Sequence, residues 1–269
     1  MNRRQFFDRL ADVAGSSAAA LLQNDYAHAA IVPPDDARLA IERVSYDSPK
    51  GKINGYLARP KAKGKRPVVL VIQENRGLNP HIEDVTRRFA AEGFLAYAAD
   101  LLSLVGGTPA SDDEARDLRA KLNQDDAVTA LVSAVSFLKK HPESAGKVGA
   151  VGFCFGGLMV NRLAAASPEL DAGVAYYGRQ VPAAQVPNIK AALMLHYAGK
   201  DDGVNAEISA YEAALKANNK KYTMYSYADA QHVFNNDTGA ARYNKAAADL
   251  AWSRTVAFFK ENLGVPPRV

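Results

Sequence analysis

The stretch VGAVGFCFGG, residues 148–157, decides the fold that the sequence predicts. It begins as a short apolar strand, continues as G-x-C-x-G, and leads into a helical pattern. A side chain at Gly152 or Gly156 would collide with neighbouring backbone in a tight strand-to-helix turn. The pattern therefore predicts a strained turn that presents Cys154 at the end of a buried strand.

Cys154 is the chain's single cysteine, so it forms no intramolecular disulfide, and no other thiol or His cluster stands at zinc spacing. A helix N-terminus behind it should lower the pKa of the thiol and favour the thiolate. The N–H of Phe155 is placed to help bind an oxyanion. A buried apolar cysteine or a nucleotide-binding glycine turn would be the alternatives. The phosphate-binding patterns are absent, because no Lys-Ser/Thr follows the turn and its spacing is not G-x-G-x-x-G.

Strand-like and helix-like segments alternate on both sides of this turn. The continuous apolar run at residues 67–72 is typical of a strand buried on both faces of a sheet. We expect further strands at 41–46, 53–58, 94–99, 148–152, 172–177, 191–197 and 222–227, helices at 82–92, 114–122, 126–140, 156–166, 206–218 and 240–263, and a loop at 101–112. Repeated β-α units demand a mostly parallel central sheet with helices on both faces, so the fold class is α/β.

An acid to orient the base is expected downstream of the cysteine. Asp201 follows the apolar strand at 191–197 and so lies at the carboxyl edge of the sheet, where ligands of α/β proteins bind. We prefer it to its neighbour Asp202, because Asp201 stands in the form G-x-D-x-x-V that ends at Val204.

His232 is the histidine that fits a general base, because it follows the last strand in a polar loop. The other four histidines have different settings: His28 lies near the N-terminus, His81 and His141 stand beside prolines at helix ends, and His196 lies inside a strand as a core residue. The ordered set Cys154, Asp201 and His232 therefore predicts nucleophile, acid and base.

Four motifs together resemble the dienelactone hydrolase (carboxymethylenebutenolidase) family of the α/β-hydrolase superfamily. They are GFCFGG at 152–157, QENRG at 73–77, GKD at 199–201 and QHVF at 231–234, and the resemblance covers residues 41–259. It implies the α/β-hydrolase fold and hydrolysis of an ester or lactone, with no metal or organic cofactor.

The resemblance also implies two roles in the loop after the third strand. Glu74 would contact the resting thiol and take part in activating it, and the N–H of Asn75 would join that of Phe155 in an oxyanion hole. A buried carboxylate beside a thiol should hold it neutral. The alternative for Glu74 is a strand-end carboxylate paired with Arg76.

The sequence departs from the family where substrate charge is recognised. Well-known members place arginines after the fourth strand and shortly after the catalytic histidine, whereas residues 100–104 and 232–236 contain none here. We therefore expect neutral esters or lactones to be hydrolysed at least as well as carboxylate-bearing ones, unless Arg76, Arg179 or Arg242 substitutes. Arg76, next to Glu74, is the candidate substrate-binding residue.

The N-terminus resembles a twin-arginine export signal. Arg3-Arg4 precedes two phenylalanines, a mildly apolar stretch spans residues 13–22, and Ala27-His28-Ala29 offers small residues for cleavage after Ala29. We expect residues 1–29 to be a signal, residues 30–269 a single catalytic domain, and the location periplasmic or secreted. The alternative is a cytoplasmic protein with an amphipathic N-terminal helix. The apolar stretch is too short for a membrane anchor.

Composition limits the partners. The net charge is +4, with 23% charged residues and no long run of like charge, so nucleic-acid and polybasic membrane binding are not expected. The sequence therefore predicts a monomer or small homo-oligomer that acts on a small-molecule ester or lactone. A thioesterase or amidase of the same fold, and a non-catalytic ligand-binding relative, stay open as alternatives.

Overall fold

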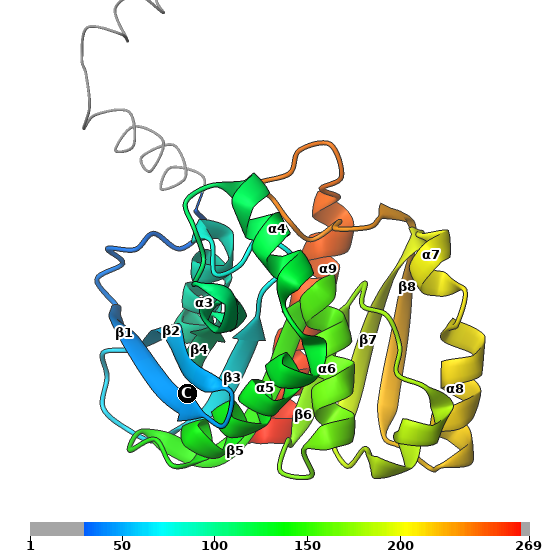
Figure 1. Ribbon diagram of the computed structural model, residues 1–269, viewed down its shortest axis with the longest axis horizontal. Helices are drawn as coiled ribbons and strands as arrows, with labels where there is room; N and C mark the ends of the chain where they lie inside the picture. The colour runs from blue at the N-terminus through cyan, green and yellow to red at the C-terminus, as the bar shows by residue number, and fades with distance from the viewer. Residues whose placement is uncertain (1–29, 265–269) are drawn as a thin grey trace, which may run out of the picture.

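The computed structural model describes residues 30–264, and these build a layered α/β structure (Figure 1). Its strands form one eight-stranded sheet in the order β1-β2-β4-β3-β5-β6-β7-β8. Their bounds are β1 Leu39–Ser48, β2 Gly51–Pro60, β3 Arg66–Ile72, β4 Leu95–Ala99, β5 Ser144–Phe153, β6 Ala172–Tyr176, β7 Ala192–Lys200 and β8 Tyr222–Gln231. The six neighbouring strands β4, β3, β5, β6, β7 and β8 run parallel to one another. At one edge of the sheet, β2 pairs antiparallel with β4, and β1 pairs antiparallel with β2. The predicted mostly parallel sheet is confirmed.

Strand β3 shows why the core has two halves. Val68, Leu70 and Ile72 pack into the hydrophobic cluster on one face, and Val69 and Val71 pack into the cluster on the other. Because successive side chains of a strand point to opposite faces, a strand buried on both sides must be apolar throughout. β3 and its neighbour β5 are also the two middle strands of the sheet, so their carboxyl ends lie in the middle of one sheet edge.

Helices cover both faces of the sheet. Their bounds are α3 Pro80–Ala91, α4 Asp112–Lys121, α5 Gln124–Lys139, α6 Phe155–Ala166, α7 Asp202–Asn205, α8 Ile208–Ala217 and α9 Lys245–Leu263, with 3₁₀ turns η1 Leu101–Val105 and η2 Ala183–Asn188. Side chains of α5, α6 and α8 belong to one core cluster, and those of α3 and α9 to the other. Figure 1 shows α5 and α6 in front of the sheet and α9 behind it.

Several element bounds differ from the prediction, for local reasons. The closing helix begins at Lys245 rather than at residue 240, because the Asn244 side chain caps it by accepting a hydrogen bond from the Ala247 N–H. The helix expected at 206–218 is two helices, α7 and α8. The loop expected at 101–112 contains η1, which is capped by Asp100.

The expected export signal, residues 1–29, lies outside the described residues, as do the last five residues of the expected domain. Among residues 30–264, none of the helices combines the length and the apolar character that crossing a bilayer requires.

Candidate active site

The turn between β5 and α6 has the strained geometry that its glycines predict. Cys154 has a φ of 54°, an uncommon conformation for a residue with a side chain. A Cβ at Gly152 would lie 2.1 Å from the carbonyl oxygen of Gly156, and one at Gly156 would lie 2.3 Å from that of Ile72. Only glycine fits at both positions, so the backbone can close tightly and leave the cysteine side chain at the strand end.

Cys154, His232 and Asp201 come together in hydrogen-bonding distance. The Sγ atom of Cys154 lies 3.1 Å from Nε2 of His232, and Nδ1 of the same ring lies 2.5 Å from Oδ2 of Asp201. The three side chains come from the ends of β5, β8 and β7, at the carboxyl edge of the parallel strands. The neighbouring Asp202 is exposed and begins α7.

The loop that carries His232 is fixed by the residues that follow it. Val233 has a φ of 72°, which is strained for a β-branched side chain. Phe234 is fully buried and packs against the rings of Tyr177 and Tyr227 at centroid distances of 5.3 and 5.0 Å. This buried anchor holds the imidazole in place and offsets the strain beside it.

Glu74 is buried near the thiol but bonds to other groups. It is 7% exposed, and its carboxylate accepts hydrogen bonds from the Tyr177 hydroxyl at 3.2 Å and the Asn236 amide at 2.8 Å. The hydrogen bond of Sγ goes to His232, and the carboxylate of Glu74 acts on the thiol through its negative charge, which raises the thiol pKa. The alternative pairing with Arg76 does not occur, because Arg76 binds Asp112 at 2.8 Å.

The thiol of Cys154 is harder to ionise than a free cysteine. Its pKa is raised to about 11, chiefly by burial and then by the negative charge of Glu74. The N–H of Phe155 and the guanidinium of Arg119 lower this pKa, but by less. The expected lowering by the helix N-terminus is therefore outweighed by burial. A pKa near 11 leaves on the order of one thiol in ten thousand ionised at pH 7.

We expect Glu74→Gln to make Cys154 more reactive toward iodoacetamide. Glutamine keeps the size of the side chain and removes the negative charge, so the pKa of the thiol should fall and the thiolate fraction at pH 8 should rise. A shift of one unit would speed alkylation about tenfold. The measurement is the alkylation rate between pH 6 and 10. An unchanged pH profile would show that Glu74 does not influence the sulfur.

The three side chains open into a pocket of about 540 Å³. Asn75 and Phe155, whose N–H groups were expected to form an oxyanion hole, both line it. Three arginines line it as well, Arg116 and Arg119 from α4 and Arg179 from the segment after β6. Arg76 and Arg242 are not part of this lining, so the expected substrate-binding role does not fit the position of Arg76.

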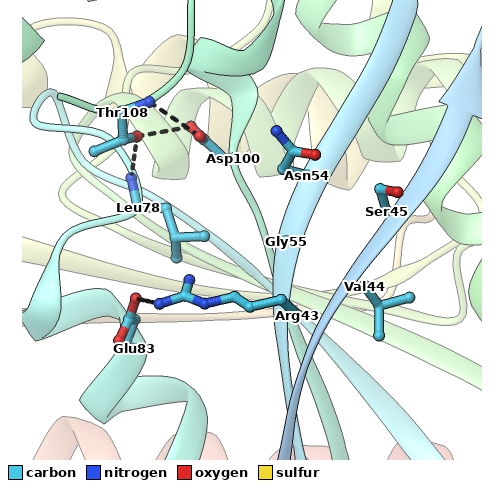
Figure 2. Close-up of a pocket in the computed structure, with 9 residues that line it drawn as sticks. All are labelled: Arg43, Val44, Ser45, Asn54, Gly55, Leu78, Glu83, Asp100 and Thr108. Atoms are coloured by element: carbon cyan, nitrogen blue, oxygen red, sulfur yellow. Dashed lines mark hydrogen bonds and ion pairs between the residues drawn. The ribbon is translucent and has the colours of Figure 1, made fainter.

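A second pocket of about 430 Å³ lies beside β1, β2 and η1 (Figure 2). Its charged groups are already engaged, as Arg43 binds Glu83 at 2.5 Å and Asp100 accepts two hydrogen bonds from Thr108. Figure 2 shows these pairs along the pocket wall, together with the Leu78 N–H that donates to Thr108. No cysteine or histidine lines this pocket. The hydrogen bonds of Thr108 to Leu78 and Asp100 join the loop after β3 to the segment after β4.

His196 was expected to be a core residue, and the structure confirms this. It is fully buried, and its ring nitrogens bond to the hydroxyls of Tyr227 and Thr255 at 2.9 and 3.1 Å. Burial lowers its pKa to about 3, so the ring is neutral at physiological pH.

Tyr177, Asn236 and Arg119 were not singled out from the sequence. Tyr177 directly follows β6, and a polar side chain at the carboxyl end of a central strand is a signal that could have found it. Asn236 lies in the stretch that was inspected for arginines, where an amide was not sought. Arg119 carried no signal, because nothing local tells which face of α4 turns toward the cysteine.

Comparison with known proteins gives the family of the chain. The profile of the dienelactone hydrolase family matches residues 53–263. A protein of Escherichia coli K12 described as "Putative carboxymethylenebutenolidase" is 32% identical over 243 residues, covering 85% of this chain and 89% of the relative. "Protein usf" of Aquifex pyrophilus is 35% identical over 232 residues, covering 82% and 99%.

A solved structure from Klebsiella pneumoniae, titled as a "Putative Dienelactone Hydrolase", superposes with a TM-score of 0.75 at 29% identity, covering 83% of this chain and 99% of that one. The family profile spans most of the chain, and the relative from Escherichia coli and the solved structure from Klebsiella pneumoniae each cover more than four fifths of it. The chain is therefore a hydrolase that belongs to the dienelactone hydrolase family.

Proposed function

We propose that this protein hydrolyses carboxylic esters or lactones with Cys154 as nucleophile, His232 as general base and Asp201 as the group that orients the base. The observation that carries the proposal is the unbroken line of contacts from sulfur to imidazole to carboxylate, at 3.1 and 2.5 Å, beside a pocket large enough for a small ester. Nucleophile, base and orienting acid in this geometry are the components of acyl transfer.

The first half of the reaction transfers the acyl group to sulfur. As the substrate carbonyl approaches, Nε2 of His232 takes the proton of Cys154, and Sγ forms a bond to the carbonyl carbon. The N–H groups of Asn75 and Phe155 bind the resulting oxyanion. When the intermediate collapses, the bond to the alcohol oxygen breaks and His232 protonates the leaving alcohol. A thioester on Cys154 remains.

Water completes the second half. His232 removes a proton from the water, whose oxygen attacks the thioester carbonyl, and the thiolate leaves and takes the proton back from the imidazole. Asp201 keeps the ring in the tautomer that presents Nε2 to the substrate and stabilises the imidazolium. The acid product leaves, and the thiol returns to its neutral resting form, which the charge of Glu74 favours.

The test of the proposed function is a substrate panel on the purified protein. It should contain p-nitrophenyl esters of increasing acyl length, small lactones, thioesters and amides, each assayed with and without prior iodoacetamide treatment. We expect esters or lactones to give the highest kcat/KM, and alkylation to abolish it. Preference for thioesters or amides, or alkylation-resistant hydrolysis, would contradict the proposal.

Arg179 supports a preference for substrates with a carboxylate. It is exposed, lines the pocket and makes no ion pair among residues 30–264. Three arginines were named as possible substitutes for the missing ones, and of these Arg179 is the one that lines the pocket. We expect Arg179→Gln to lower kcat/KM about ten- to a hundredfold for mono-p-nitrophenyl adipate, because a charged hydrogen bond contributes about 1.5–3 kcal/mol. The neutral methyl ester should be hardly affected.

Arg76→Gln is the matched control, because this arginine binds Asp112 outside the pocket. It should leave the ratio of the two rates unchanged. Equal losses of Arg179→Gln on both substrates would remove the case for charge recognition, while leaving ester hydrolysis itself intact.

A further inference from the structure

Charged and titratable groups that follow four different strands surround the sulfur of Cys154. Glu74 approaches from the end of β3 and Asp201 from the end of β7, and both raise the pKa of the thiol. His232 contributes the base after β8, and Tyr177 stands after β6 with its hydroxyl on Glu74. Because both carboxylates oppose the ionisation of the sulfur, a fixed cation that adds to the imidazolium of His232 would favour the thiolate.

The arginines around the pocket differ in whether their charge is already paired. Arg116 forms an ion pair with Asp113 on its own helix, and Arg179 is exposed on the segment after β6. Arg119, one turn beyond Arg116 on α4, makes no ion pair among the described residues. Its Nε is buried and has no hydrogen-bond partner. The charge of Arg119 is therefore directed at the pocket without an acid to neutralise it.

The Phe155 ring holds the guanidinium of Arg119 in place. The Cζ atom lies 4.0 Å from the ring centroid, a close cation–π contact. Phe155 is 5% exposed and directly follows Cys154, so its ring is held by the surrounding core beside the nucleophile. The contact brings a cation from α4 to the N-terminus of α6. Burial lowers the pKa of Arg119, yet an arginine stays charged at any pH of interest, and the thiolate form of Cys154 raises that pKa again.

We propose that Arg119, held over the Phe155 ring, is the cation that stabilises the negative sulfur of Cys154 while His232 carries its proton. The proposal deepens the proposed function, since it names a residue that supports the first step of acyl transfer. The proton moves from sulfur to Nε2, so a thiolate and an imidazolium form within 3.1 Å of each other, between the carboxylates of Glu74 and Asp201. Arg119 balances one of these negative charges, and no bond to it is formed or broken.

The experiment measures the sulfur without requiring hydrolysis. Alkylation of the full-length protein by iodoacetamide is followed from pH 6 to 10 for the wild type and for Arg119→Gln, Arg119→Lys and Lys121→Gln. Removing the positive charge should raise the pKa of the thiol, because the thiolate loses its stabilising partner, and so move the alkylation profile to higher pH. We expect Arg119→Gln to react about three- to tenfold more slowly at pH 8.

The two other variants separate charge from packing. Arg119→Lys keeps the charge and should restore most of the rate, although its ammonium stacks less well on an aromatic ring. Lys121→Gln removes the same charge from an exposed position on the same helix and should match the wild type. A profile of Arg119→Gln that equals the wild type, or equal losses in the glutamine and lysine variants, would overturn the proposal. If alkylation behaves as expected while no ester is hydrolysed, the proposed function fails and the role of Arg119 stands.

Discussion

Cys154→Ala should abolish ester hydrolysis, with kcat/KM falling at least about a thousandfold toward the rate of the uncatalysed reaction. The reason is that sulfur forms the covalent bond to the acyl group, and the remaining imidazole and amides have no nucleophile to assist. The measurement is p-nitrophenyl ester hydrolysis by purified wild type and variant at equal concentration. Thermal unfolding checks that the variant is folded.

The fold should survive this change. Cys154 is partly exposed, and alanine retains the Cβ and the backbone conformation that the strained turn requires. The unfolding temperature should therefore stay close to that of the wild type. A folded Cys154→Ala protein that hydrolyses esters at more than a tenth of the wild-type rate would show that the nucleophile lies elsewhere.

Asp201→Asn should lower kcat about 10²- to 10⁴-fold with a much smaller change in KM. Asparagine fits the same space but can present an N–H to Nδ1, which favours the wrong tautomer of His232 and removes the charge that stabilises the imidazolium. The 2.5 Å contact between Oδ2 and Nδ1 makes this coupling direct. Steady-state kinetics on one ester give the two constants.

Asp202→Asn is the matched control for this prediction. It makes the same chemical change at the next residue, whose carboxylate is exposed on α7. Its kinetics should lie within about twofold of the wild type, since surface substitutions away from such contacts have small effects. Similar losses in both variants would indicate that negative charge near the pocket, rather than contact with the imidazole, is what matters.

The features that the sequence predicted are those that local physics determines. The turn around Cys154 could be predicted because the tight turn leaves no space for a side chain at Gly152 or Gly156, and both glycines lie within the same five residues of sequence. Asp201 and His232 could be found because each directly follows a strand, and the ends of parallel strands meet at one edge of the sheet. The apolar run in β3 indicated burial on both faces for the same kind of reason.

The features that it missed depend on packing between distant segments. Arg119 reaches the pocket because α4 packs against the N-terminus of α6, where the Phe155 ring lies. Arg76 does not line the pocket, because it forms an ion pair with Asp112 at the start of α4. For the ionisation of Cys154, the sequence predicted that the charge of Glu74 would hold the thiol neutral, and the structure bears this out. It also predicted a net lowering of the thiol pKa by the helix N-terminus, which is wrong because the burial of the thiol, not visible in the sequence, has the larger effect. Side-chain orientation on a helix and depth of burial are both properties of the assembled fold.

The most direct test of the account is to trap the acyl group on sulfur. The wild-type protein is mixed with an excess of p-nitrophenyl acetate, quenched in acid within the first turnovers, digested with pepsin and analysed by mass spectrometry. The account predicts an acetyl group on the peptide that contains Cys154, attached as a thioester that hydroxylamine releases and absent from Cys154→Ala. Hydrolysis of the ester with no acyl group on Cys154, or with a stable acyl group on another residue that forms at the rate of turnover, would contradict it.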